Sequence, residues 1–142
     1  MRTRILLVLL FGIVGVLIEL LLLGHTEDRR QWIPIATLAM GAGTVLWHLL
    51  RPRRLTGRMM LAVMSTFVAS GVLGVWYHFS GNREFEIELR PSMEGFELFR
   101  EAMTGATPAL APGTMVLLGL IGLVATLGTP DSPHDTPTEE ES

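Results

Sequence analysis

Four residues of this chain have side chains that could bind a metal ion together: Glu19, His25, Glu27 and His78. Two imidazoles and a carboxylate suit zinc, iron or copper, and haem held by His25 and His78 is a variant of this hypothesis. No HxxxH or ExxH pair lies on one predicted helix, so the ligands would come from separate segments. A structural interpretation competes, in which Glu19 and His78 bond to each other or to a backbone carbonyl, and His25 and Glu27 are ordinary loop residues.

Other kinds of chemistry find no support in the sequence. The chain has no cysteine, which excludes disulfides, thiolate metal sites and thiol nucleophiles. Its glycine-rich stretches match no phosphate-binding fingerprint, and it contains no catalytic triad or nucleotide motif. The net charge of −3 gives no reason to expect a nucleic-acid partner. We therefore expect no enzymatic activity and, apart from the metal or haem alternative, no cofactor.

Four apolar runs must position these side chains. They cover residues 5–23, 32–50, 59–79 and 109–128, and each is 19 to 21 residues long. The hydrocarbon core of a bilayer is about 30 Å thick and takes about 20 helical residues to cross. The sequence therefore predicts an all-α membrane protein with a bundle of four transmembrane helices in residues 1–128. The last helix is expected over residues 109–128; the prolines at positions 108 and 112 give an alternative, in which it begins only near Pro112 and is a short span.

Arginine placement predicts the orientation in the membrane. The connection at residues 51–58 holds four arginines and no acid, whereas the other connections mix arginine with acidic residues. Cytoplasmic loops carry an excess of basic residues. This connection, together with Arg2 and Arg4, is therefore expected on the cytoplasmic side of a bacterial-type inner membrane, with both termini cytoplasmic. Residues 129–142 are rich in proline and acid and are predicted to be a disordered tail.

Small side chains indicate how the helices pack, because helices in lipid associate through close packing rather than through apolar attraction. The third run has a ladder of small residues spaced by four, and the first two runs have shorter sets. The predicted helix-packing residues are Gly12, Gly15, Gly41, Gly43, Ala62, Thr66, Ser70 and Gly74. Glu19 and His78 extend these stripes, so both are expected to point toward protein. His48 extends the small-residue stripe of the second run near the opposite membrane surface, and it is expected to make a structural hydrogen bond.

The segment from residue 80 to residue 108 is predicted to lie outside the membrane. Charged and apolar residues alternate over residues 84–90, a pattern that indicates a short strand or extended arm. The apolar side of this arm would carry Phe85, Ile87 and Leu89. These three residues need a cover, so they are candidates for docking a partner.

A short amphipathic helix is predicted over residues 93–104, with Ser92 as its cap. The helix is too short to span a bilayer, so it is expected to lie on the outer membrane surface. Phe96 and Phe99 are on its apolar side and are further docking candidates.

The predicted function is that of an accessory or scaffold subunit, which packs against a larger energy-transducing or transport complex and has no catalytic activity. Its expected partners are the lipid bilayer and other membrane protein subunits, or further copies of itself. One alternative is a small metal- or haem-binding membrane protein that is redox-active or proton-coupled. A second is a homo-oligomeric channel or transporter, which would need several copies to enclose a pore.

Overall fold

The computed structural model describes residues 1–24, 26, 28–105 and 109–127, and within these residues it contains helices and no strand. The elements are α1 (Arg2–Leu22), the 3-10 helix η1 (Arg29–Gln31), α2 (Trp32–Leu50), α3 (Arg54–Leu89), α4 (Gly95–Thr104) and α5 (Gly113–Leu127). The predicted all-α class is confirmed. His25, Glu27 and the predicted tail at residues 129–142 lie outside the described residues.

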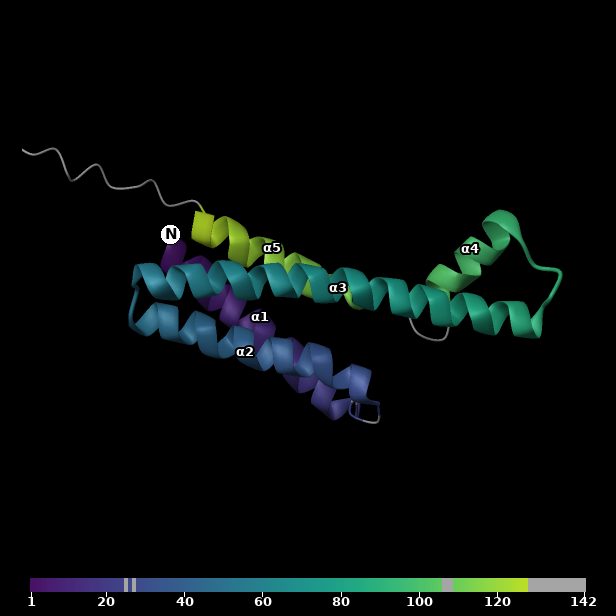
Figure 1. Ribbon diagram of the computed structural model, residues 1–142, viewed down its shortest axis with the longest axis horizontal. Coiled ribbons are helices and arrows are strands. Elements are labelled where there is room, and N and C mark those ends of the chain that lie inside the picture. The colour runs from purple at the N-terminus through teal and green to yellow at the C-terminus, as the bar shows by residue number, and fades with distance from the viewer. Residues whose placement is uncertain (25, 27, 106–108, 128–142) are drawn as a thin grey trace, which may run out of the picture.

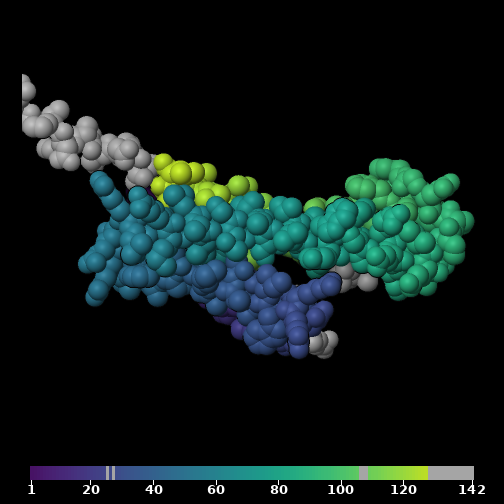
Figure 2. Space-filling model, in the orientation of Figure 1, coloured from purple at the N-terminus to yellow at the C-terminus, as the bar shows by residue number. Residues whose placement is uncertain are grey.

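Four of the helices, α1, α2, α3 and α5, form a bundle in which each contacts two others (Figure 1). α3 packs against α2 and α5, and α1 packs against the same two helices. The start of α1, the connection between α2 and α3 and the end of α5 lie at one end of the bundle (Figure 1). At the other end α3 runs beyond its neighbours, and α4 folds back along the protruding part (Figures 1 and 2).

Among the described residues, three helical segments are long and apolar enough to cross a membrane: α1, α2 together with η1, and α3. Large apolar side chains cover the outside of the bundle, including Phe11, Ile18, Leu46 and Leu117. Such an exterior suits lipid rather than water. α5 has 15 residues, or about 22 Å of helix, which is shorter than a hydrocarbon core of about 30 Å. The four-span prediction is thus supported for three helices, and α5 begins at Gly113, next to the expected Pro112.

The core of the bundle is centred on α3. Phe67 and Met64 are fully buried there, and α1 and α2 supply further apolar side chains that are almost completely covered: Leu9, Ile13, Leu38 and Val45. Glycines on the neighbouring helices make room for them. A Cβ at Gly41 would overlap the Phe67 ring, and one at Gly119 would lie 2.8 Å from the Met64 carbonyl oxygen. Large residues on α3 therefore fit against small residues on α2 and α5.

The predicted small-residue stripe of α3 is only partly at a helix contact. Ala62 and Thr66 are exposed and Ser70 is half-buried, whereas Gly74 meets the Pro112 side chain at the start of α5. The reason is that the buried face of α3 runs through Met64, Phe67 and Gly71 instead: the two large residues enter notches on α2 and α5, and Gly71 lies against Val116 of α5. Four glycines on α1 and α2 were predicted to lie at helix contacts. Gly12 and Gly41 do so, whereas Gly15 and Gly43 face open space.

The predicted extended arm at residues 84–90 is wrong, because α3 continues as a helix through Leu89. A sequence that alternates charged and apolar residues can also form a helix. Residues four positions apart then lie on the same side of the helix and can contact the same neighbouring element. Here Asn82 and Glu86, one turn apart, are both buried on the side that faces α4. The contact with α4 therefore stabilises the helical form of this segment.

α4 is shorter than predicted and begins at Gly95, with Glu94 at its N-cap and no side-chain cap. Gly95 has φ of 64°, a left-handed conformation that favours glycine and turns the chain at this point. The predicted cap by Ser92 is therefore not formed. Residues 95–104 are helical as predicted, and Phe96 and Phe99 are exposed on α4. The placement of this helix on the outer membrane surface stays a prediction.

Candidate functional site

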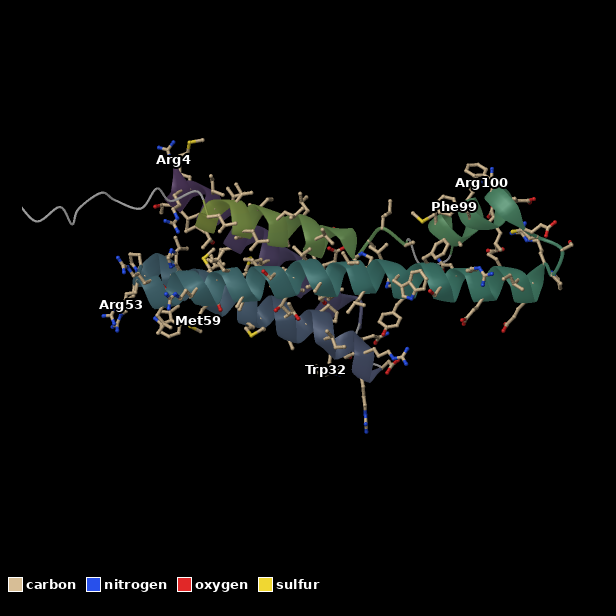
Figure 3. All side chains as sticks on the ribbon, turned by 45° about the horizontal axis from the view of Figure 1, so that its top comes forward. Arg4, Trp32, Arg53, Met59, Phe99 and Arg100 are labelled. Carbon is tan, nitrogen blue, oxygen red and sulfur yellow. The ribbon has the colours of Figure 1, made fainter. Side chains whose placement is uncertain are left out.

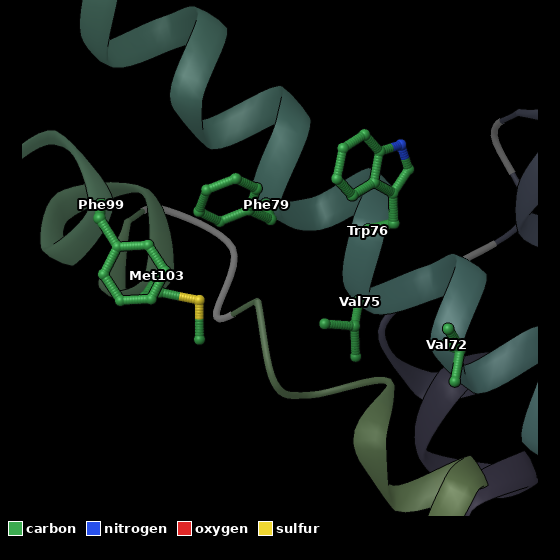
Figure 4. A pocket seen from close by; sticks show the side chains of 6 residues that line it. All are labelled: Val72, Val75, Trp76, Phe79, Phe99 and Met103. Carbon is green, nitrogen blue, oxygen red and sulfur yellow. The ribbon is translucent and has the colours of Figure 1, made fainter. Parts of the chain in front are cut away.

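An apolar hollow of about 280 Å³ lies between the protruding part of α3 and α4 (Figure 4). The residues that line it come from these two helices: Val72, Val75, Trp76, Phe79, Phe99 and Met103. On α3 they follow the spacing i, i+3, i+4, i+7, which places them on one helix face. None of the six is charged, so the hollow suits an apolar group rather than an ionic ligand.

A row of aromatic rings runs along the hollow from α3 to α4. The ring centroids of Trp76 and Phe79 are 6.5 Å apart, those of Phe79 and Phe99 are 5.9 Å apart, and those of Phe99 and Phe96 are 6.2 Å apart. Rings at these separations attract one another beyond the effect of area burial. The last ring of the row is nevertheless exposed, since Phe96 is 78% accessible. The row is a preformed apolar surface that no described residue of this chain covers.

One buried hydrogen bond holds α4 against α3. Asn82 Nδ2 donates to the carbonyl oxygen of Ala102 over 2.9 Å, and both residues are buried. Gly105 lets the chain pass close to this contact, since a Cβ there would lie 3.0 Å from Asn82 Cγ. The position of α4 therefore depends on a specific polar contact and not only on apolar packing.

An ion-pair network adds to this contact at the far end of α3. Arg90 donates to the largely buried Glu86 carboxylate over 2.6 Å and lies 3.8 Å from Glu101 of α4. The hydrogen bond to Glu86 raises the pKa of Arg90 above its ordinary value, with the nearby carboxylate charges acting in the same direction. Arg90 thus links two acidic groups, one on each helix. We call α3 from Val72 onward, together with α4, the α3–α4 hairpin.

Replacing Asn82 by alanine should loosen α4 from α3. The change removes the donor and leaves the buried Ala102 carbonyl without it, a loss of about 1–2 kcal/mol. Hydrogen exchange of the amides in α4, measured by mass spectrometry in detergent, should become at least about fivefold faster. Arg83→Ala, an exposed neighbour on the same helix turn, is the control and should leave exchange unchanged. Equal protection of α4 in Asn82→Ala and the parent chain would contradict this role.

The described part of the chain does not bring the metal candidates together. Glu19 is exposed on α1 instead of facing a neighbouring helix, and His78 is half-buried on α3, whose backbone does not come close to that of α1. Among the described residues, no group of three or more His, Asp or Glu side chains could hold a metal ion. His25 and Glu27 lie outside those residues, so the metal and haem hypothesis stays a prediction.

The docking candidates fall into two groups. Phe96 and Phe99 belong to the aromatic row. Phe85 and Leu89 share another exposed face of α3, one turn apart, whereas Ile87 lies on the opposite side and is half-buried. The reason is again the helical form of this segment, which separates residues that an extended arm would have aligned.

Sequence reasoning did not identify the α3 side of the hollow, because its residues belong to an apolar run and look like any other lipid-facing residues. The usable signal was their spacing together with the two aromatic residues at positions 76 and 79. The direction in which α4 folds back carries no local signal of this kind.

No protein-family model, no curated protein and no solved structure matches this chain. The fold defines its class: a helical protein with three helices that could span a membrane and a protruding hairpin with an apolar hollow. Any functional conclusion therefore depends on the geometry of that hairpin.

Proposed function

We propose that this protein is a small accessory or scaffold subunit of a bacterial-type cytoplasmic membrane, which docks on a larger energy-transducing or transport complex through its α3–α4 hairpin. The observation that carries the proposal is the uncovered aromatic row beside an apolar hollow of about 280 Å³. The partner is expected to insert an apolar side chain or a short apolar helix face into this hollow.

The depth of the hollow supports this role. If α3 enters the hydrocarbon core near Met59, about 20 residues bring it to the opposite interface near Phe79. Trp76 and Tyr77 lie at this level on α3, as interfacial aromatics do. Arg30 of η1 stacks over the Tyr77 ring at 5.4 Å, which ties the start of α2 to the same level. The hollow would then open at the interface, and the rest of the hairpin would stand outside the membrane.

The chemistry of the hairpin fits a protein partner. Binding energy at interfaces is concentrated in a few aromatic and arginine residues, surrounded by a polar rim. Here Trp76, Phe96 and Phe99 would be the anchors, and Glu97 and Arg100 of α4 are exposed beside them. The hydrogen bond between Asn82 and Ala102 fixes the anchors in advance. A preordered surface of this kind loses little conformational entropy on binding.

The arginine distribution supports the proposed orientation. The start of α1 and the connection between α2 and α3 lie at the end of the bundle away from the hairpin (Figure 1), where Figure 3 labels Arg4 and Arg53. These two segments and the first turns of α3 carry six arginines: Arg2, Arg4, Arg51, Arg53, Arg54 and Arg58. By the positive-inside rule this end would be cytoplasmic, and the hairpin would face the opposite side. A partner would then be engaged at the outer face of the membrane.

The test is extraction of the tagged protein in a mild detergent, followed by mass spectrometry of the proteins that remain bound in stoichiometric amounts. Phe96→Ala removes an exposed anchor and should weaken retention of the partner by about 30-fold, equivalent to about 2 kcal/mol. Phe11→Ala is the matched control: it makes the same change on α1 at a side chain that is 82% exposed. It should leave retention unchanged.

Two outcomes would contradict the proposal. One is a chain that stays alone after mild extraction of the native membrane. The other is a partner that is retained equally by Phe96→Ala and Phe11→Ala, because the contact would then lie elsewhere.

A further inference from the structure

A second recess lies at the opposite end of the bundle, between the start of α1 and the end of α2. Its volume is about 130 Å³. It is lined by Arg2, Thr3, Leu6, His48, Leu49 and Pro52. One water molecule takes about 30 Å³ in the liquid, so the recess has room for a group of roughly four water volumes. Unlike the hollow beside α4, it has a cation and polar groups in its wall.

A hydrogen-bond chain fixes the His48 ring in this wall. Thr56 Oγ1 donates to the Arg53 carbonyl oxygen over 2.9 Å and accepts from the Arg53 N–H over 3.0 Å. His48 Nδ1 lies 2.8 Å from the same hydroxyl. Because the hydroxyl donates its one proton to the Arg53 carbonyl oxygen, we assign to Nδ1 the proton of the hydrogen bond between His48 and Thr56. Nε2 then carries a lone pair and accepts from Arg2 over 3.4 Å. The predicted structural hydrogen bond of His48 is confirmed, and it orients Arg2.

The Arg2 guanidinium has an N–H donor without a hydrogen-bond acceptor. Its Nε is buried and has no hydrogen-bond partner in the structure. A guanidinium carries five N–H donors in a planar fork, and a buried donor without an acceptor is unfavourable. Besides the Nη2 group that contacts His48, the guanidinium has further N–H donors, and Arg2 lines the recess, so an anionic ligand there would accept from this fork. Thr3, also in the wall, offers a hydroxyl.

The charge around the recess is uniformly positive in the described chain. Six arginines lie at this end, and residues 29–83 contain no acidic residue; nor do residues 1–18. No carboxylate of these segments can neutralise Arg2, and α5, the other helix that reaches this end, has none either. We call this region the basic end.

We propose that the recess at the basic end binds a phosphate group, with the Arg2 guanidinium as its main ligand. Phosphate oxygens match the planar fork of arginine, and the recess has the size for a tetrahedral oxyanion. The recess is at the ends of α1 and α2, where lipid headgroups begin, and basic pockets between membrane helices bind the headgroups of anionic lipids. The phosphate can belong to such a lipid or be free in solution, and the experiment separates these two sources.

The experiment uses the purified full chain in a neutral maltoside detergent. Phosphatidylglycerol is added, and bound lipid is counted by native mass spectrometry while thermal stability is followed in parallel. Phosphatidylcholine, whose choline is repelled by the arginines, should bind at least about tenfold more weakly. Inorganic phosphate at millimolar concentration is then added. Loss of the bound lipid assigns the site to a small phosphate, and retention assigns it to the lipid headgroup.

Arg2→Gln should reduce phosphatidylglycerol retention about tenfold, because it removes the charge and the fork together. Arg4→Gln is the matched control, since Arg4 is exposed and does not line the recess; it should change retention by less than about twofold. Circular dichroism checks that each variant is folded. If Arg2→Gln is not, Arg2→Lys keeps the charge but loses the fork, and it should still bind more weakly than the parent chain.

The proposal is overturned if neither phosphatidylglycerol nor inorganic phosphate binds the parent chain. It is also overturned if Arg2 variants bind as well as the parent, or if Arg4→Gln loses as much binding as Arg2→Gln. In the last case the phosphate would be held by the general charge of the basic end.

Discussion

Gly119→Ala should lower the free energy of unfolding of this protein by about 2–3 kcal/mol. Gly119 is buried on α5, and a Cβ at this position would lie 2.8 Å from the Met64 carbonyl oxygen and 2.9 Å from Phe67 Cβ. A backbone carbonyl cannot turn aside as a flexible side chain can, so α3 and α5 must move apart. Alanine favours a helix by up to about 1 kcal/mol over glycine, which offsets only part of this loss.

Gly43→Ala is the matched control, because Gly43 is also inside a helix and has no atom within 4 Å of its Cβ position. It should be neutral or slightly stabilising. Both variants can be measured by reversible unfolding in mixed detergent micelles, with helix content followed by circular dichroism. Equal stability of Gly119→Ala and Gly43→Ala would mean that α3 and α5 are not in close contact at this point.

Gly122→Ala gives an intermediate case on the same helix. A Cβ there would overlap the Sδ and Cγ atoms of Met64, and a methionine side chain shifts more easily than a backbone carbonyl. The expected loss is therefore smaller than for Gly119→Ala. The ranking of the three glycines tests whether backbone contact, rather than burial alone, determines the cost.

The apolar runs were sufficient to predict α1, α2 and most of α3, because a stretch of about 20 apolar residues allows few structures other than a membrane helix. α2 agrees with its run at both ends. The end of α3 could not be found in this way. Residues 84–89 are polar enough to be a loop and alternate like a strand, and contact with α4 decides between these forms.

Packing faces were predicted less well than helices, for a physical reason. A small residue marks a close contact only if a partner fills the space beside it, and the sequence does not name the partner. Gly12 and Gly41 have such partners, whereas Gly15 and Gly43 do not. Gly71, Gly119 and Gly122 make close contacts that the stripes did not include.

Only the α4 side of the candidate site was predicted from the sequence. Phe96 and Phe99 were recognised from the amphipathic pattern of α4, which is local. Val72, Val75, Trp76 and Phe79 were not, because only the fold brings α4 against them. The arginine cluster was predicted as a topology signal, but the fold adds the recess that Arg2 lines and the burial of the Arg2 Nε atom.

Phe67→Ala should be the most destabilising single truncation in the bundle, at about 3 kcal/mol. Phe67 is fully buried, and its ring occupies the notch at Gly41 of α2 while its Cβ faces Gly119 of α5. In lipid the loss comes from packing contacts and not from transfer to water, which places it at the lower end of the range for Phe→Ala changes. Phe11→Ala, at an exposed position, should cost less than about 1 kcal/mol in the same unfolding assay.

A double-mutant cycle with Gly41 separates this specific contact from general loss of volume. Gly41→Ala alone should be destabilising, because its Cβ would overlap the Phe67 ring. In the Phe67→Ala background that ring is gone, and the nearest atom of any other residue is Ile13 Cδ1 at 3.6 Å, an ordinary van der Waals distance. The same change should then be harmless. The coupling energy should therefore be about 1–2 kcal/mol. Additive effects would show that α2 and α3 do not meet through this pair, and the helix order of the bundle would have to be revised.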